Sequence, residues 1–210
     1  MRKFTKAATG TAVTGAALIA AIGLAAAPAF ASVNQAVVSG SPSGGVITAT
    51  ATTPTLTDNT TGAKLTCTSA SATGSVLNGV YTAGAPTAIK VGTITKAAWS
   101  TCKLNSITFT VTAGTLPWNL LVTGVTASGS TPVSLTGVSA KLTGLCTATI
   151  TGSVTGSFVN SSHTLSITGG SLSVSGVGGL CLGLINNGDS ITYKANYVLA
   201  STAPVVVTAT

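Results

Sequence analysis

Few side chains in this sequence could carry out acid–base chemistry. His163 is the only histidine, Asp58 and Asp189 are the only acidic residues, and the 210 residues include no glutamate. A serine hydrolase needs a nucleophile, a base and an orienting acid, so His163 with one aspartate is the only set available. The chain has no G-x-S-x-G nucleophile elbow. We therefore expect no enzyme activity, and we interpret His163 as a residue of a turn or a strand rim.

The two aspartates could act together only if the fold joined two positions that are far apart in the sequence. Glycoside hydrolysis, for example, needs two carboxyl groups that flank one bond. Each aspartate instead stands in a turn sequence, Asp58-Asn59 or Asn187-Gly188-Asp189, where an Asx turn explains it. Asn186, Asn187 and Asp189 could contribute to a calcium site, but one carboxylate makes such a site weak. The sequence thus predicts two turns, no metal and no cofactor.

Four cysteines are the other reactive groups of the chain. An even number of cysteines in an exported protein indicates disulfides, and a zinc site would need short C-x-x-C spacings with histidines, which this sequence lacks. Three pairings are possible. The spacing from Cys67 to Cys102 equals the spacing from Cys146 to Cys181, and this symmetry favours Cys67–Cys102 and Cys146–Cys181.

Aromatic side chains offer the best candidates for ligand binding: Trp99, Trp118 and Tyr193. A glycan or another flat ligand would need two or three aromatic rings exposed on one face. Trp118 follows Pro117, which is typical of a core anchor at the start of a strand. Trp99 lies three residues before Cys102, where it would pack on a disulfide. Core packing is the favoured interpretation for both tryptophans, and Trp99 is the first to test for exposure.

Residues 1–31 have the three parts of a secretory signal peptide. Arg2, Lys3 and Lys6 form a positive start, Ala17 to Ala27 is apolar, and Ala29-Phe30-Ala31 is a cleavage site. A membrane anchor is the alternative. No run of 18 apolar residues follows Ser32, so the mature chain should contain no transmembrane helix. We expect cleavage before Ser32 and a protein that is secreted or associated with the cell envelope.

The predicted mature chain, from Ser32 to the end, is rich in hydroxyl groups and poor in charge. Serine and threonine make up about a third of it, while six lysines and two aspartates leave a formal net charge of +4. Nucleic-acid binding needs clustered basic residues, so no nucleic-acid partner is expected. Glutamate, arginine and methionine, the usual residues of helix surfaces, are missing after residue 31, which excludes a helical bundle.

Apolar and hydroxyl residues alternate with a period of two, for example over 105–112, 146–154 and 191–199. This pattern is typical of strands with one buried face, and threonine suits the solvated face of a sheet. We expect an all-β fold, an antiparallel β-sandwich or a barrel-like double sheet of about ten to twelve short strands. A single domain would span residues 44–210, and residues 32–43 would form a loose N-terminal arm.

Three dipeptides favour two-residue hairpin turns: Gly169-Gly170, Asn78-Gly79 and Asn187-Gly188. A turn at Gly169-Gly170 would place all the apolar residues of its two strands on one face. The opposed pairs expected from the three turns are Ile167 with Leu172, Leu165 with Val174, Val76 with Tyr81, and Leu184 with Ile191.

The two halves of the chain are faintly alike. Lys64-Leu65-Thr66 before Cys67 has a counterpart in Lys141-Leu142-Thr143 before Cys146, and the two cysteines of the second half repeat those of the first at one constant offset. Two related halves from a duplication would explain this. Chance is the rival explanation, because a sequence rich in serine, threonine and glycine produces such matches easily.

Four short segments of the chain resemble segments of other secreted proteins. One of them is Leu116-Pro-Trp118-Asn-Leu120, and the other three surround cysteines. The other segments are Lys64-Leu-Thr-Cys67-Thr-Ser, Cys146-Thr-Ala-Thr-Ile and residues 179–189. They resemble small secreted, disulfide-containing, β-rich proteins of actinomycetes, and the resemblance covers most of the mature chain. That group has no assigned activity. The resemblance therefore implies export, disulfides and a β fold, and it carries over no catalytic residues.

These features predict an exported, non-enzymatic β-domain protein with a structural or binding role in the cell envelope or outside the cell. Its partners would be cell-wall or envelope components, or other copies of itself. One alternative is a module that binds glycans or small ligands through Trp99 or a tyrosine face. A second alternative is an oligomeric β-pore of the envelope, which would carry an outward-facing apolar band.

Overall fold

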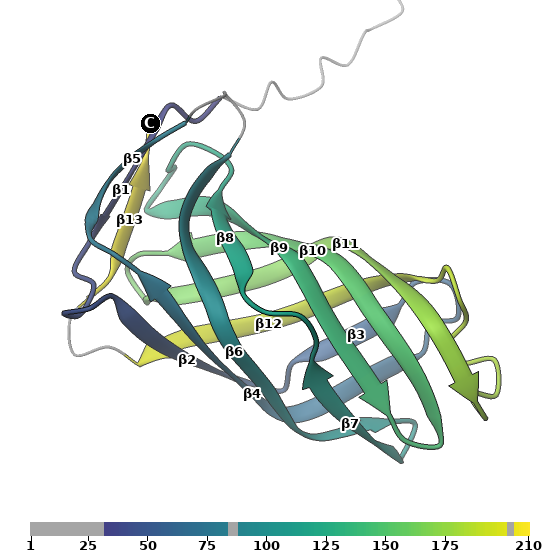
Figure 1. Ribbon diagram of the computed structural model, residues 1–210. Helices are drawn as coiled ribbons and strands as arrows, with labels where there is room; N and C mark the ends of the chain where they lie inside the picture. Colours follow the sequence, from purple (N-terminus) through teal and green to yellow (C-terminus); the bar gives the residue numbers. More distant parts are fainter. Residues whose placement is uncertain (1–31, 84–87, 201–203) are drawn as a thin grey trace, which may run out of the picture.

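The computed structural model describes residues 32–83, 88–200 and 204–210 (Figure 1). The predicted signal peptide, residues 1–31, lies outside this range. The described residues form thirteen strands, all paired antiparallel, in two sheets. The strands are β1 (Gln35–Ser39), β2 (Val46–Thr52), β3 (Thr55–Asp58), β4 (Lys64–Val76), β5 (Gly79–Thr82), β6 (Ile89–Leu104), β7 (Ile107–Ala113), β8 (Trp118–Val122), β9 (Ser130–Thr143), β10 (Cys146–Val159), β11 (Thr164–Gly179), β12 (Ser190–Ala200) and β13 (Val206–Ala209).

Ten strands close into a barrel with eight positions around its circumference. β4, β6, β9, β10, β11 and β12 each fill one position, and the pairing of β4 with β6 closes the ring. β2 and β3 fill one further position in succession, because the chain bends between them at Thr53 and Pro54. β7 and β8 share the last position, since both pair with β6 and with β9. The all-β prediction is confirmed, and the double sheet is a closed barrel.

The alternation seen in the sequence separates the inside of the barrel from the outside. Along β10, Ala148, Ile150 and Val154 are buried in the interior, whereas Thr151 and Thr155 are exposed. The strands are longer than expected, since β6 and β11 have 16 residues each. Tilted strands run diagonally across the whole barrel wall, which requires this length. No helix in the described part of the chain is long and apolar enough to cross a membrane.

The second sheet has three strands in the order β13-β1-β5 and lies at one end of the barrel (Figure 1). The expected loose arm at residues 32–43 is therefore a wrong prediction, because β1 pairs on both sides. Val33, Ala36 and Val38 are at most 2% exposed and pack in a cluster with Phe158 of the barrel. The partner strand β13 comes from the far end of the chain, so no local sequence signal indicated this pairing.

The predicted hairpin at Gly169-Gly170 is also wrong. β11 runs through both glycines and pairs with β10 on one side and β12 on the other. Gly170 has a φ of 138°, and a Cβ there would collide with the carbonyl oxygen of Ser153. The register shifts here, and a bulge of this kind exchanges the inward and outward positions of a strand. The apolar residues still share the interior, as predicted: Leu165, Ile167, Leu172 and Val174.

The other two predicted turns do not close hairpins either. After Asn78 the chain leaves the barrel, and Gly79 pairs with Val38 of β1, in place of the expected pair Val76–Tyr81. Ile191 pairs with Leu172 and not with Leu184. Turn residues permit a hairpin, but each strand here finds a better partner elsewhere in the sheets.

Both predicted disulfides are confirmed, Cys67–Cys102 and Cys146–Cys181. The register places them at the same end of the barrel, since Cys67 lies opposite Cys102 near the β6–β7 turn and Cys146 follows the β9–β10 turn. We call this end the disulfide end, and the opposite one the small-sheet end. Both halves of the chain contribute strands to one barrel, and a duplication stays a prediction.

Candidate functional site

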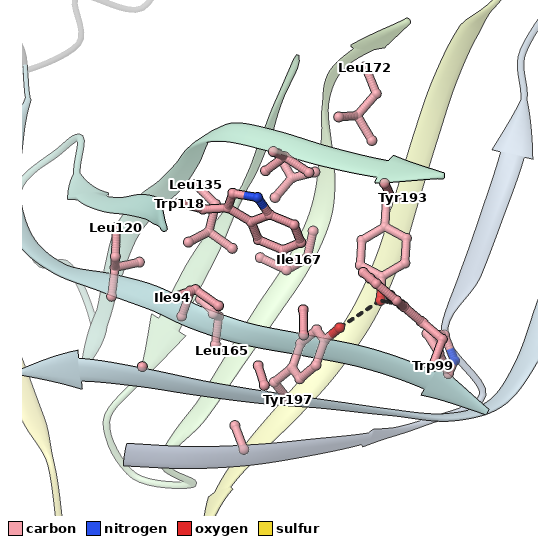
Figure 2. A pocket seen from close by; sticks show the side chains of 18 of the residues that line it. Ile94, Trp99, Trp118, Leu120, Leu135, Leu165, Ile167, Leu172, Tyr193 and Tyr197 are labelled. Carbon is pink, nitrogen blue, oxygen red and sulfur yellow. Dashed lines mark hydrogen bonds between the residues drawn. The ribbon is translucent and has the colours of Figure 1, made fainter. Parts of the chain in front are cut away.

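The interior of the barrel contains a cavity of about 110 Å³. Aliphatic side chains such as Ile94, Leu135 and Ile167 form most of its wall (Figure 2). The wall continues towards the small-sheet end through Val91 and Phe158. Apolar cavities of this order can stay dry and accept a guest of about the size of a benzene ring. We call this cavity the lumen, and it is the site that the fold offers to a ligand.

Besides Phe158 of β10, four aromatic side chains line the lumen: Trp99 of β6, Trp118 of β8, and Tyr193 and Tyr197 of β12. The tryptophan rings have centroids 6.4 Å apart and are tilted by 40°. Tyr193 and Tyr197 are four residues apart, so both point to the same side of their strand. Figure 2 shows the two tyrosines leaning towards each other across the wall of the lumen.

A short chain of hydrogen bonds joins the polar atoms of three of these aromatic residues. The Trp99 Nε1–H donates to the Tyr193 hydroxyl oxygen at 3.1 Å, and the hydroxyl oxygens of Tyr193 and Tyr197 are 2.7 Å apart. The Trp118 Nε1–H is not part of this chain, because it donates to the Thr115 carbonyl at 2.9 Å. The three residues Trp99, Tyr193 and Tyr197 are called the hydroxyl cluster below.

The hydroxyl cluster contains one more hydrogen-bond donor than its internal hydrogen bonds require. It contains three donor hydrogens, one on Trp99 and one on each tyrosine, but only two hydrogen bonds link its atoms. One tyrosine O–H therefore lacks an acceptor among the described residues. This hydroxyl is an unused hydrogen-bonding group in an otherwise apolar wall.

Both tyrosines keep their protons at neutral pH. Burial raises the pKa of Tyr193, and the hydrogen bonds with Tyr197 and Trp99 oppose that rise only in part. Burial is the main reason that the pKa of Tyr197 lies well above its usual value, and the neighbouring Tyr193 raises it further because it disfavours a second negative charge. The unused group is thus a hydroxyl donor and not a phenolate, so it would bind an acceptor atom.

The three candidate binding residues are together, but inside the barrel and not on its surface. Trp99, Trp118 and Tyr193 all line the lumen. Trp118 is only 5% exposed, so it packs in the core, as predicted. The three rings do not form a surface platform for glycans. Sequence reasoning did not single out Tyr197. Tyr197 lies four residues after Tyr193 in the same strand, so the alternation of side chains places both on one face. This spacing was the sequence signal that could have identified Tyr197.

His163 lies far from the two aspartates. It stands in the turn between β10 and β11, as predicted, and its Nδ1 is 3.1 Å from the carbonyl oxygen of Val205. That turn is at the small-sheet end, whereas Asp58 and Asp189 are both at the disulfide end. The described residues do not bring the histidine together with either acid.

The two aspartates, in contrast, are brought together. Asp58 ends β3 and lies opposite Ile191 of β12, two residues after Asp189. Each carboxylate also organises its own turn, as the sequence predicted. Asp58 Oδ1 accepts the N–H of Thr60 at 2.8 Å, and Asp189 Oδ2 accepts the N–H of Asn186 at 2.7 Å.

Comparison with known proteins adds no relative to this description. No protein family, no curated protein and no solved structure matches this chain. Any function must therefore be argued from the lumen and from the residues that surround it.

Proposed function

We propose that this protein is an exported, non-enzymatic binding protein that holds a small, largely apolar molecule in the lumen of its barrel. The observation that carries the proposal is the apolar lumen with one unused hydroxyl in its wall. Ligand sites in proteins combine a mostly apolar lining with a few placed polar groups. A barrel of eight strands is wide enough either to fill its interior with side chains or to hold one small ligand.

The lumen also defines the chemistry of the ligand. Its volume accepts one ring or a short branched chain, and larger ligands would require Trp99 or Trp118 to move. The unused O–H of the hydroxyl cluster would pair with a single acceptor, such as a carbonyl or ether oxygen. An apolar compound with one such oxygen fits better than a charged one, because none of the described residues in the wall carries a charge.

Two observations support an extracytoplasmic place for this function. All four cysteines are in disulfides, and such bonds persist in oxidising compartments. Residues 1–31 have the sequence of a signal peptide. Export is thus part of the proposal, together with the resemblance to secreted actinomycete proteins.

The pore alternative has less support. An envelope pore presents apolar residues to lipid and polar residues to its channel. Here the order is reversed, since Ile150 and Val154 face the interior while Thr151 and Thr155 are exposed on the outside.

Filling the lumen tests the proposal. Anisole, an uncharged single-ring compound with one ether oxygen, would be titrated into the oxidised protein by calorimetry, because its size and its one acceptor atom match the lumen. Ala97 lines the lumen and its neighbour Ala98 is exposed on the outer face. We expect Ala97→Phe to abolish the heat of binding and Ala98→Phe to leave it unchanged, with circular dichroism showing that both variants fold.

The opposite outcome would reject a binding lumen. If the probe does not bind, or if it binds equally to Ala97→Phe and Ala98→Phe, the aromatic residues serve only to pack the core. Organic extraction of protein purified from its native source, followed by mass spectrometry, would identify a bound compound.

A further inference from the structure

Three leucines form an exposed apolar rim at the disulfide end of the barrel. Leu145 is 60% exposed, Leu180 is 70% exposed and Leu182 is 73% exposed. The Leu180 N–H donates to the Leu145 carbonyl at 3.2 Å, and the disulfide Cys146–Cys181 joins the residues next to them. These two links hold the leucines beside one another. We call Leu145, Leu180 and Leu182 the leucine rim.

The local backbone does not explain why leucine stands at these positions. Leu182 has a φ of 52°, a left-handed conformation that glycine or asparagine adopts at lower cost than leucine. Leu145 lies in the two-residue turn between β9 and β10, whereas Asn105 and Ser106 form the corresponding turn between β6 and β7. Neighbouring apolar side chains that are neither buried nor favoured by their turns indicate a contact surface.

Exposed lysines stand on the barrel wall behind the leucine rim. Lys64 is the first residue of β4, Lys103 is the penultimate residue of β6, and Lys141 is the third residue from the end of β9. These strand ends lie at the same end of the barrel (Figure 1). All three lysines are exposed. Because a strand rises about 3.3 Å per residue, each of them begins within about 10 Å of the turns at this end.

No acidic side chain on the surface opposes these charges. Asp58 and Asp189 are the only acidic residues of the protein, and both are buried. The other lysines of the barrel, Lys90, Lys96 and Lys194, lie farther from the turns of the disulfide end. Along the barrel axis, the disulfide end therefore presents an apolar tip first and a belt of positive charge second.

We propose that the disulfide end docks on an anionic lipid surface. The leucine rim would enter the boundary between headgroups and acyl chains, where apolar residues of peripheral proteins lie about 5–10 Å deep. Lys64, Lys103 and Lys141 would then lie at the level of the lipid phosphates, and each lysine near an anionic surface adds attraction. Docking at this end does not require a ligand in the lumen.

A second copy of this protein fits the leucine rim less well than a lipid surface does. In a symmetric dimer the same patch meets itself, so Lys103 and Lys141 of one copy would approach those of the other. Since neither aspartate is exposed, no acidic side chain could pair with them. Like charges that face each other disfavour association.

The small-sheet end also exposes apolar residues, but it lacks this pattern of charge. Val46 and Leu77 are each more than half exposed there. Among the described residues, Lys90 is the only lysine within three positions of a strand end on that side. Val46 and Leu77 are therefore a matched control for the leucine rim.

Co-sedimentation of the oxidised protein with lipid vesicles tests the docking surface. One set of vesicles contains phosphatidylcholine alone, and the other contains about one third phosphatidylglycerol, which is anionic. We expect the phosphatidylglycerol vesicles to bind the protein at least about tenfold more tightly than the neutral ones. Sodium chloride at about 0.5 M should weaken this binding, because salt screens the attraction between lysines and phosphates.

Substitution of the leucines tests the apolar part of the surface. Leu180→Ser/Leu182→Ser should weaken binding to the phosphatidylglycerol vesicles by about tenfold or more, because two apolar side chains no longer leave water. Val46→Ser/Leu77→Ser removes two exposed apolar side chains from the other end and should change binding by less than about twofold. Circular dichroism checks that both variants fold.

Substitution of the lysines tests the charged part. Lys103→Gln/Lys141→Gln should weaken binding to the same vesicles by about tenfold or more. Lys90→Gln/Lys96→Gln removes the same charge from exposed positions outside the belt, and it should weaken binding by less than about threefold.

Four results would overturn the proposal. The first is no binding to the phosphatidylglycerol vesicles. The second is an equal loss in Leu180→Ser/Leu182→Ser and Val46→Ser/Leu77→Ser, and the third is an equal loss in the two lysine pairs, which would reflect net charge alone. The fourth is a dimer, seen by sedimentation without vesicles, that Leu180→Ser/Leu182→Ser dissociates, because a second copy would then cover the leucine rim.

Discussion

The two ends of the barrel are closed by different physical means. At the small-sheet end, β13-β1-β5 buries a second apolar cluster that includes Val38, Val122 and Phe158. The Asn160 side chain pairs with both the N–H and the carbonyl of Val207, so it fastens β13 to the barrel like a neighbouring strand. At the disulfide end, the loop of residues 180–189, called the end loop, adds one buried side chain, Ile185, to the core cluster of the barrel.

The disulfide end replaces apolar burial with covalent and polar links. Both disulfides and both aspartates are there. Three leucines are also more than half exposed on the two turns next to Cys146–Cys181: Leu145, Leu180 and Leu182. A short loop cannot bury enough apolar surface to stay closed by itself, so cross-links do this work. The small-sheet end should therefore be the rigid end, and the disulfide end should be the one that opens.

The largest effect should come from the apolar cluster of the small-sheet end. Phe158→Ala removes a ring that is 5% exposed and should lower the free energy of unfolding by about 4 kcal/mol. Phe158→Leu should cost about 1 kcal/mol, because most of the volume remains. Chemical denaturation measures both. A loss below about 1 kcal/mol for Phe158→Ala would show that the small sheet contributes little to stability.

Removing the disulfide of the end loop should have the next largest effect. Cys146→Ala/Cys181→Ala opens a link between residues 35 positions apart and should cost about 3 kcal/mol. Hydrogen exchange should accelerate first at residues 180–189, while β1, β5 and β13 keep their protection. Uniform acceleration at both ends would contradict the proposed difference between them.

The stability of the protein should depend more on Tyr193, the central member of the hydroxyl cluster, than on Tyr197, an outer member. Tyr193→Phe leaves both the Trp99 N–H and the Tyr197 hydroxyl without their bonds and should cost about 2 kcal/mol. Tyr197→Phe removes one bond and should cost about 1 kcal/mol. Thermal unfolding of the two variants and of the double variant checks this order, and the double variant should cost less than the sum.

Acid should weaken the disulfide end alone, and this effect should be the smallest of the four. The pKa of Asp189 in the folded protein is below its ordinary value of 3.8. Its contribution to stability is present above that value and is lost as the pH falls through the lower folded pKa. Unfolding measured from pH 5 to pH 2 should show this loss. Asp189→Asn should abolish this part of the pH dependence, and an unchanged profile would contradict the assignment.

Much of the fold could be predicted because its signals are local. Alternation identified the strands, and symmetric spacing identified the disulfide pairs. The failure at Gly169-Gly170 is instructive, because a turn and a bulge both exchange the parity of a strand. Either device puts Leu165, Ile167, Leu172 and Val174 on one face, so the sequence predicted the shared face correctly and the hairpin wrongly.

The candidate sites were less predictable because they join distant positions. Trp99 and Tyr193 were candidates by residue type, but their hydrogen bond joins β6 to β12 across 94 residues. Asp58 and Asp189 were each explained by a turn, and that explanation was right but incomplete. Nothing in either turn sequence indicates that the other lies beside it.

The sequence by itself determined the class of fold, the face that each strand buries and the partners of the cysteines, because these depend on period, residue type and spacing. Only the tertiary structure decided that the sheet closes into a barrel, which ends are covered, and which polar groups meet inside. The reason is physical: closing the ring and pairing β1 with β13 depend on backbone hydrogen bonds, which are the same for every residue type and leave no mark on the sequence.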